Sequence, residues 1–380
     1  MLPEALPYHL KVRDHFRQHS STWEFFAAAR TREEQLISFQ TELLKNTYQF
    51  RRDTDAGLYA QIDLAREKLG LAQLMVTAYQ AQYANDLELN ASIVYLHQEA
   101  HLVFSGPMRQ RLNETEMLAV IAHELSHVRL YTLLDGELEV ADRIITAIAN
   151  HAGNSDAPYY ETARLFKLYT EIFCDRGAYA VVGDADAVIT GLLKIATGLS
   201  EVKVEDYPNF IRTRALRLWH EQQDQAEPVI TRMIEGLTDL DRLDLFTQAS
   251  LYELTRIFLL GLLQPEALRS VLVLGLAHQY FSGLSWAVPA EDDLRERLDA
   301  ALAGSQPSIH DYFSYLLLDF ALADPALEGL LLGRTLVFAE EVRLSAVYEP
   351  ICKKELQLPD KKWQQYKRSA LDAYQSIQSE

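Results

Sequence analysis

The chain has 380 residues, of which 48% are hydrophobic and 24% charged, so it holds enough apolar material for two or three globular domains. Its formal net charge of −18 repels nucleic-acid phosphates and anionic lipid headgroups, and we expect no nucleic-acid partner. Two cysteines are too few for a disulfide framework, and the apolar runs are too short for a membrane span. The polar N-terminus lacks the apolar core of a signal peptide, so we expect a cytoplasmic protein.

The first part of the chain changes character near residue 90. Apolar residues recur at helical spacing through residues 1–89, which predicts helices. Residues 92–96 and 102–104 are β-branched and aromatic, and they predict two short strands. The polar residues 97–100 predict a turn between these strands, and His101 at its end should face solvent.

A buried helix is predicted next. Asn113 offers an N-cap, and Glu116 three residues later completes a variant of the capping box. The helix should run over about 115–134, and residues 117–122 are apolar on all sides, which is typical of a helix in a core.

Residues 135–160 show no clear pattern, with a loop predicted at 153–156. A second long helix is predicted over 159–182 and should stop at Gly183. Further helices are expected around 185–199 and 209–223, and nearly all the remaining chain is helical in pattern, with breaks at 264–265, 282–283 and 304–307.

The first long helix carries the motif His123-Glu124-Leu125-Ser126-His127. Residues four apart share one helix face, so both imidazoles can bind one zinc ion. Glu124 projects beside the ion and can take a proton from a water that the metal activates. The alternative is an ordinary helix with a solvated His and Glu, but the apolar flanks would then bury these groups unpaired.

A catalytic zinc needs a third protein ligand. Glu171 is favoured because it lies deep in the second helix among apolar residues, and Asp175 one turn later can accept the free N–H of a ligating histidine. The alternative is a solvated acidic helix face. Other downstream candidates are His151, Glu161, Cys174 and Asp175 itself, although Cys174 is more readily explained as a small buried hydrophobic residue.

An arginine cluster follows these acidic residues. Arg212, Arg214 and Arg217 would present cations after Pro208, and one of them can stabilise the oxyanion of a tetrahedral intermediate. We assign this role to Arg212, with Arg214 as the alternative. A salt-bridged helix face would explain the cluster equally simply.

These residues together resemble the gluzincin metallopeptidase family of the HtpX heat-shock proteases and the CaaX prenyl proteases, over about residues 55–220. The resemblance rests on the segments 58–59 and 68–71, the two strands with Asn90-Ala91, the approach 112–122 to the zinc motif, Glu171 with Asp175-Arg176, and Tyr207-Pro208 with 212–216. The chain departs from the family where Tyr207 replaces a histidine, in the arginine spacing, and in lacking a visible membrane anchor.

The resemblance implies an α+β, mostly helical protein, with a gluzincin-like domain that has a small β-sheet edge. It implies zinc on His123, His127 and Glu171, and Glu124 as the base. It also implies a polypeptide substrate that lies along the sheet edge as an added strand.

Three segments are expected: a metallopeptidase domain with N-terminal helices over 1–225, a helical connecting region over 226–305, and a helical domain over 306–380. The last segment weakly resembles the tellurite-resistance TerB-like domain, and a generic helical bundle explains it equally well. The function hypothesis is a zinc metalloendopeptidase with Glu124, Asp175 and Arg212 in its catalytic machinery. The alternative is a zinc-stabilised, catalytically latent interaction protein, which binds a protein partner through the helical C-terminal region.

Overall fold

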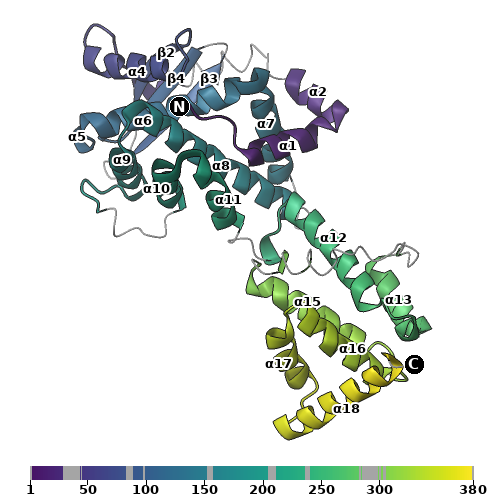
Figure 1. The fold of residues 1–380 in the computed structure, drawn as a ribbon. Helices are drawn as coiled ribbons and strands as arrows, with labels where there is room; N and C mark the ends of the chain where they lie inside the picture. Colours follow the sequence, from purple (N-terminus) through teal and green to yellow (C-terminus); the bar gives the residue numbers. More distant parts are fainter. Residues whose placement is uncertain are drawn as a thin grey trace. The chain divides into compact units, whose positions relative to one another are not determined.

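The computed structural model describes residues 2–28, 43, 45–82, 89–96, 99–151, 157–203, 211–235, 240–281, 284, 298, 301–302 and 305–378. The chain divides into two compact units, Met1–Arg232 and Met233–Glu380 (Figure 1). The described residues are mostly helical, with one small mixed sheet, as expected for an α+β protein.

The elements of the first unit, in chain order, are α1 (Pro7–Arg17), α2 (Ser20–Ala28), β1 (Thr47–Gln49), α4 (Ala56–Lys68), β2 (Met75–Ala81), β3 (Asn90–Leu96), β4 (Glu99–Ser105), α5 (Met108–Arg111), α6 (Glu114–Thr132), α7 (Glu137–His151), α8 (Ala157–Val182), α9 (Ala185–Thr197) and α10 (Ile211–Gln222). Helix α11 (Glu227–Glu235) begins in this unit and ends just beyond it.

The sheet has the strand order β1-β2-β4-β3, so β3 lies at an edge. Strands β2 and β4 run parallel, whereas β1 pairs with β2 and β3 with β4 in the antiparallel sense. Ala100, Leu102 and Phe104 of β4 lie on one face of the sheet and are buried in the core, because successive side chains of a strand point to opposite faces. Helix α6 packs against β3 and thereby brings the edge strand beside the His-Glu motif.

The structure corrects three expectations about the first part of the chain. Residues 1–89 are not all helical, because β1 and β2 lie within them. The predicted turn is shorter than expected, since Glu99 begins β4, while residues 97 and 98 lie outside the described part. His101 does not face solvent: it is buried, and its Nδ1 lies 3.3 Å from the Tyr79 hydroxyl.

Residues 135–160 are also more regular than expected. Helix α7 occupies most of this stretch, while the loop predicted at 153–156 lies outside the described residues. Between α6 and α7, Leu134 and Asp135 have positive φ angles of 52° and 56°, so the chain turns sharply there.

The helix of the His-Glu motif begins where the sequence predicted. The Asn113 side chain accepts a hydrogen bond from the Glu116 backbone N–H at 2.8 Å, and the Glu116 carboxylate accepts one from the Asn113 N–H at 2.9 Å. This reciprocal box satisfies two amide groups that the first helical turn leaves free. Lys194 of α9 lies 2.8 Å from Glu116 and neutralises the buried carboxylate.

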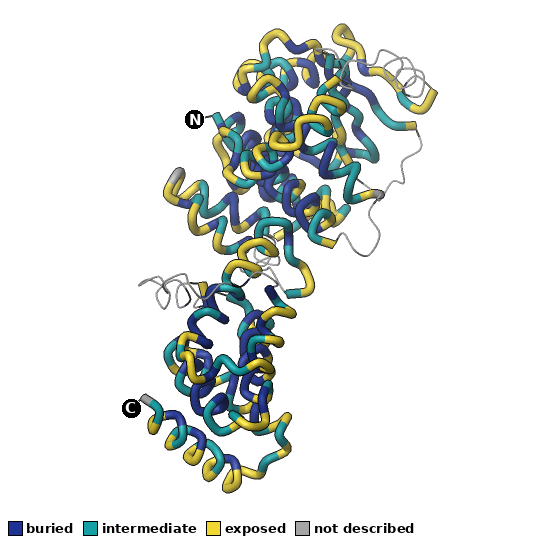
Figure 2. The backbone as a smooth tube through the Cα atoms, turned by 90° about the vertical axis from the view of Figure 1, so that its right-hand side faces the viewer, coloured by how far each residue is buried: buried dark blue, intermediate teal, exposed yellow. Residues whose placement is uncertain are grey.

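Helices α6 and α8 pack at close range along much of their length. Both helices are largely buried. Figure 2 shows the buried residues of each unit in dark blue. Gly177 of α8 lies against Ser126 of α6, and a Cβ atom at position 177 would overlap the Ser126 hydroxyl. Because glycine has no side chain, Gly177 allows α6 and α8 to lie close together beside His123 and His127.

His9 fixes α1 against α8. Its Nδ1 accepts the backbone N–H of Leu6 at 3.3 Å, its Nε2 lies 3.2 Å from the Thr170 hydroxyl, and its ring meets Phe166 edge-on. Burial lowers the pKa of His9 from its ordinary 6.5 to about 3, so the folded protein holds this imidazole neutral.

We expect the first unit to lose stability in acid because of His9. His9 binds a proton near pH 6.5 in the unfolded chain but not in the folded chain. Its contribution to the free energy of unfolding is therefore fully present above pH 6.5. Between pH 6.5 and pH 3 this contribution falls by up to ~1.4 kcal/mol per pH unit. Urea titrations at pH 7 and pH 5, followed by circular dichroism, measure this difference. His9→Gln removes the titrating group and should show a smaller pH dependence. Equal pH dependence in both proteins would contradict the assignment.

The regular elements described in the second unit are all helices, as expected. Its helices are α12 (Leu245–Leu262), α13 (Val271–Tyr280), α15 (Pro307–Ala321), α16 (Glu328–Glu341), α17 (Ser345–Glu355) and α18 (Asp360–Gln378). Phe258, Phe313 and Phe338 meet in its core. The predicted break at 264–265 follows the end of α12, while residues 282–283 lie outside the described part.

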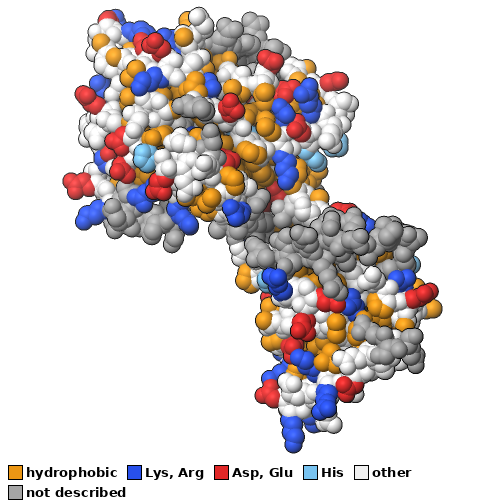
Figure 3. All heavy atoms as spheres, in the orientation of Figure 1, with side chains coloured by type: hydrophobic (Ala, Val, Ile, Leu, Met, Phe, Trp, Pro, Cys, Tyr) orange, Lys and Arg blue, Asp and Glu red, His pale blue; other side chains and the backbone are white. Residues whose placement is uncertain are grey.

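A search of the described helices found none that is both long and apolar enough to cross a bilayer. Acidic and basic side chains are interspersed over the described parts of the face drawn in Figure 3.

Candidate metal centre

His123 and His127 project from one face of α6, as their spacing predicted. Their ring centroids are 5.2 Å apart, and the planes are nearly perpendicular at 80°. Both side chains line a cavity of about 460 Å³, together with Glu124 and Glu171. The two imidazoles therefore meet a carboxylate from the facing helix at the wall of an accessible cavity.

Glu171 of α8 reaches both imidazoles. Its Oε2 lies 3.4 Å from Nε2 of His123, and its Oε1 lies 3.8 Å from Nε2 of His127. Zinc bonds of about 2.0–2.1 Å in a tetrahedral shell place neighbouring ligand atoms about 3.4 Å apart. These three side chains therefore fit around one zinc ion with small adjustments.

Asp175 forms a hydrogen bond with the Nδ1 side of the His123 ring. Its Oδ1 accepts a hydrogen bond from Nδ1 of His123 at 2.9 Å. This bond fixes the proton on Nδ1 and leaves Nε2 as the lone-pair nitrogen that a metal ion requires. Asp175 is almost completely buried, so the orientation of the imidazole is well defined.

Arg212 of α10 binds both carboxylates of α8. Its Nε and Nη2 donate to the two oxygens of Asp175 at 2.8 and 2.7 Å, and its Nη1 lies 2.8 Å from Oε2 of Glu171. Arg214 is exposed, so Arg212 is the arginine of this helix that faces the site. Residues 207 and 208, which carry part of the family resemblance, lie outside the described residues.

The charges of this group are strongly coupled. Burial opposes ionisation of Glu171, but the hydrogen bond and charge of His123 and the charge of Arg212 lower its pKa to about 2. Burial likewise opposes ionisation of Asp175, yet Arg212 holds its pKa well below the usual range. Burial favours neutral His123, but hydrogen bonds to Asp175 and Glu171 raise its pKa to about 9.

A proton on Nε2 of His123 would point at Glu171, where a metal ion would lie, so proton and metal compete for one position. When His123 is neutral, Glu171 and Asp175 carry two negative charges against the single positive charge of Arg212. The remaining negative charge favours a dication, and burial lowers the pKa of His127 to about 4, which keeps that imidazole neutral for ligation.

Glu124 lies in the cavity wall beside the two histidines. Burial raises its pKa from 4.5 to about 7, and the charge of Glu171 acts in the same direction. A carboxylate with a pKa near neutrality can both accept and return a proton, which is the property required of a general base that later acts as an acid.

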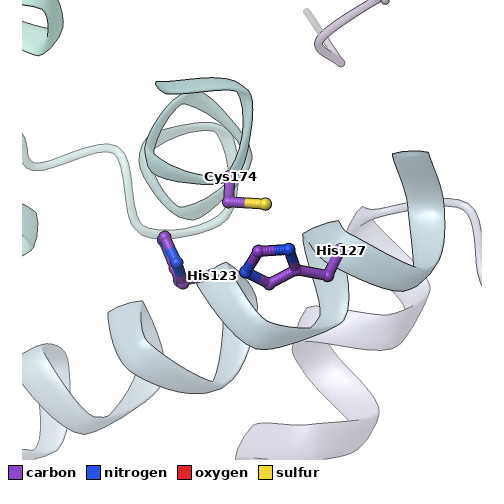
Figure 4. Close-up of side chains that lie close together, drawn as sticks. All are labelled: His123, His127 and Cys174. Carbon is purple, nitrogen blue, oxygen red and sulfur yellow. The ribbon is translucent and has the colours of Figure 1, made fainter. Parts of the chain in front are cut away.

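Cys174 also faces the imidazoles. Its sulfur and one nitrogen from each of His123 and His127 all lie within 4.8 Å of one another. Figure 4 shows Cys174 projecting from α8 toward the two rings on α6. The residue is fully buried, as the sequence suggested, but its position makes it a potential ligand as well.

Of the other third-ligand candidates, Glu161 does not line the cavity. The carboxylate of Glu161 is paired with Arg164 at 2.6 Å, and the side chain of His151 lies outside the described residues. Sequence reasoning missed Tyr131, which lines the cavity and donates a hydrogen bond to Asp142 at 2.7 Å. Its position four residues after His127 on the same helix was the available signal.

The remaining cavity wall comes from residues of β3, α6 and α9 that have no metal-binding or catalytic side chain. Strand β3 contributes residues 90–93, α6 contributes Ala119 and Val120, and α9 contributes Val188, Leu192 and Ile195. The cavity thus has an exposed strand edge on one side and an apolar helix on the other.

Arg176 fastens α10, the helix of Arg212, to α8. It is buried, its guanidinium lies 4.1 Å from the centroid of the Trp219 ring, and its Nη1 lies 2.7 Å from Glu227.

Arg176→Ala should lower the free energy of unfolding by about 3 kcal/mol, because it removes one partner of a largely buried ion pair. Arg51→Ala, which removes an exposed pair, should lower it by less than about 1 kcal/mol. Denaturant unfolding measures both, and equal losses would contradict this role.

Comparison of the chain with protein-family models, with curated proteins and with solved structures found no match.

Proposed function

We propose that the protein is a zinc-dependent metalloendopeptidase of the gluzincin kind. The observation that supports this most is the convergence of His123 and His127 from α6 with Glu171 from α8 at the cavity wall, with Glu124 beside them. Three protein ligands leave one position of a tetrahedral shell for the reaction, as in catalytic rather than structural zinc sites. Zinc, when bound, supplies a Lewis acid that lets a water molecule lose a proton near neutral pH.

Glu124 moves the protons. A carboxylate oxygen of Glu124 accepts a proton from the attacking water and later gives it to the nitrogen of the leaving amine. Burial raises the pKa of this carboxyl to about 7, which makes it a stronger base than an exposed glutamate. An interaction protein with purely structural zinc would have no use for a buried acid at this position.

The substrate is a polypeptide in extended conformation. Strand β3 lies at the edge of the sheet, and its first four residues line the cavity next to His123 and Glu124. A peptide that pairs with β3 would pass in front of the zinc ligands with its main chain held by strand hydrogen bonds. The apolar side chains of Val188, Leu192 and Ile195 would then contact its side chains on the opposite wall.

Arg212 orients the carboxylates rather than the substrate. Its three donors bind Asp175 and Glu171, so it fixes the ligand and the group that supports His123. We propose this orienting role for Arg212 in place of direct oxyanion stabilisation, because the two carboxylates already bind its guanidinium charge.

Cleavage of unfolded proteins tests this proposal. We expect the zinc-loaded full chain to release fragments from a panel of reduced, unfolded proteins, as detected by mass spectrometry, and a chelator to stop the reaction. If zinc-loaded protein and its variants leave every substrate intact, the alternative is favoured, namely a zinc-stabilised interaction protein that acts through the helical C-terminal region.

A further inference from the structure

Helix α8 presents two metal-binding side chains to the histidine pair, not one. Glu171 and Cys174 are three residues apart and therefore share a helix face. The carboxylate lies 3.4 Å from Nε2 of His123, and the Cys174 sulfur belongs to the group whose ligand atoms lie within 4.8 Å of one another. Figure 4 shows this sulfur on the side of α8 that faces both rings.

The distances require only a small movement. Zinc–sulfur and zinc–nitrogen bonds of about 2.3 and 2.0 Å in a tetrahedral shell separate sulfur from nitrogen by about 3.6 Å. The sulfur and one nitrogen of each imidazole lie within 4.8 Å of one another, so a shift of the order of 1 Å would bring the sulfur to bonding distance from an ion held by these nitrogens. Glu171 is not a member of this group and reaches the same imidazoles through its own contacts. A turn of the short Cys174 side chain about its first torsion provides such a shift.

The chemistry of the group also favours ligation. Zinc binds thiolate, imidazole and carboxylate, and a coordinating thiol loses its proton outright. Cys174 is completely buried and lies behind the cavity rather than in its wall, so it approaches the ion from the protein side and leaves Glu171 on the cavity side.

We propose that Cys174 is a fourth protein ligand of the ion held by His123, His127 and Glu171. This inference rests on the proposed function and adds a means of regulation to it. Four protein ligands close a tetrahedral shell, which is the arrangement of structural rather than catalytic zinc sites. The resting protein is therefore latent, and it becomes active when the sulfur leaves and a water molecule takes its place.

The exchange is balanced in protons and bonds. As the metal–sulfur bond forms, the Cys174 thiol releases its proton to solvent; when that bond breaks, the sulfur takes up a proton and again becomes a neutral buried thiol. No oxidant or reductant is involved.

Cobalt substitution tests the ligand directly. Co²⁺ replaces zinc in tetrahedral sites, and a thiolate bound to it gives an intense near-ultraviolet charge-transfer band that imidazole and carboxylate do not give. We expect this band in the Co²⁺-loaded full chain, and we expect Cys174→Ser and Cys174→Ala to bind Co²⁺ without it. Cys352→Ala is the matched control, because Cys352 is the other buried free cysteine and lies in the second unit, and it should keep the band.

Activity supplies a second measurement. If the closed form outweighs the open one by about ten to one, zinc-loaded Cys174→Ala should cleave unfolded protein about tenfold faster than the wild type. Cys352→Ala should cleave at the wild-type rate.

The outcomes separate this inference from the proposed function. A wild-type spectrum without the band, in a protein that binds one Co²⁺ per chain and cleaves substrate, overturns the role of Cys174 and leaves the peptidase proposal standing. A band that disappears in Cys174→Ser, together with no cleavage by any zinc-loaded variant, supports the ligand and removes the peptidase. A band that survives in both Cys174 variants overturns the inference whatever the activity.

Discussion

Glu124→Gln should abolish peptide hydrolysis while the protein keeps its fold and its zinc. Glutamine has the same shape as glutamate but cannot accept a proton, so proton transfer is lost and the three metal ligands remain. The rate should fall by at least ~10²- to 10⁴-fold, the usual contribution of a general acid–base group. Mass spectrometry of the fragments and metal analysis of the same sample measure both properties.

Glu161→Gln is the matched control for this experiment. Glu161 is a buried carboxylate of the same unit, but it is paired with Arg164 and does not line the cavity. Its replacement should leave cleavage close to the wild-type rate. Normal cleavage by Glu124→Gln would place the chemistry elsewhere in the molecule.

Gly177→Ala should damage the metal centre from a distance. The new Cβ would overlap the Ser126 hydroxyl, so α6 and α8 must move apart, and the ligands are divided between these two helices. Overpacking of this kind destabilises proteins by about 1–3 kcal/mol. We expect such a loss together with a marked fall in zinc affinity, because a site formed by two helices depends on their separation.

Gly191→Ala controls for the substitution itself. A Cβ atom at Gly191 would lie 3.5 Å from the Glu116 carbonyl oxygen, which is an ordinary contact, and α9 supplies no ligand. Denaturant unfolding and zinc titration of both variants give the comparison. If Gly177→Ala binds zinc as tightly as Gly191→Ala does, the close packing of α6 and α8 does not determine the geometry of the site.

Local signals in the sequence account for the parts that were predicted correctly. The capping box of Asn113 and Glu116, the apolar run over 117–122 and the stop at Gly183 are all short-range features, and α6 and α8 lie where these features placed them. The face shared by His123 and His127, and that shared by Glu171 and Asp175, follow from helix geometry alone. The structure brings these two faces together.

Long-range pairing explains what the sequence could not provide. Strand β2 pairs in parallel with β4, 24 residues later by register, and this pairing cannot be read from the sequence. Its local signal was limited to Val76, Thr77 and Tyr79, which are β-branched or aromatic. His101 is buried because Tyr79 of that strand lies beside it. The choice of Arg212 over Arg214 depends on how α10 packs against α8, and spacing within one helix cannot decide it.

The cavity wall formed by α9 was missed for a related reason, whereas the sheet edge at Asn90-Ala91 was part of the family resemblance. The apolar face of α9 carries no chemical motif, and it becomes part of the site only through the packing of α9 against α6. Tyr131 had a local signal in its spacing from His127, but only the structure shows that its hydroxyl binds Asp142.

Metal content tests the central claim most directly. After mild purification or reconstitution with zinc, we expect about one zinc ion per chain, because the proposed ligands His123, His127 and Glu171 would form one site. His123→Ala and His127→Ala should each lose most of this metal, and His278→Ala, a histidine of the second unit, should retain it. A wild-type protein that carries no zinc and takes none up on reconstitution would contradict the account.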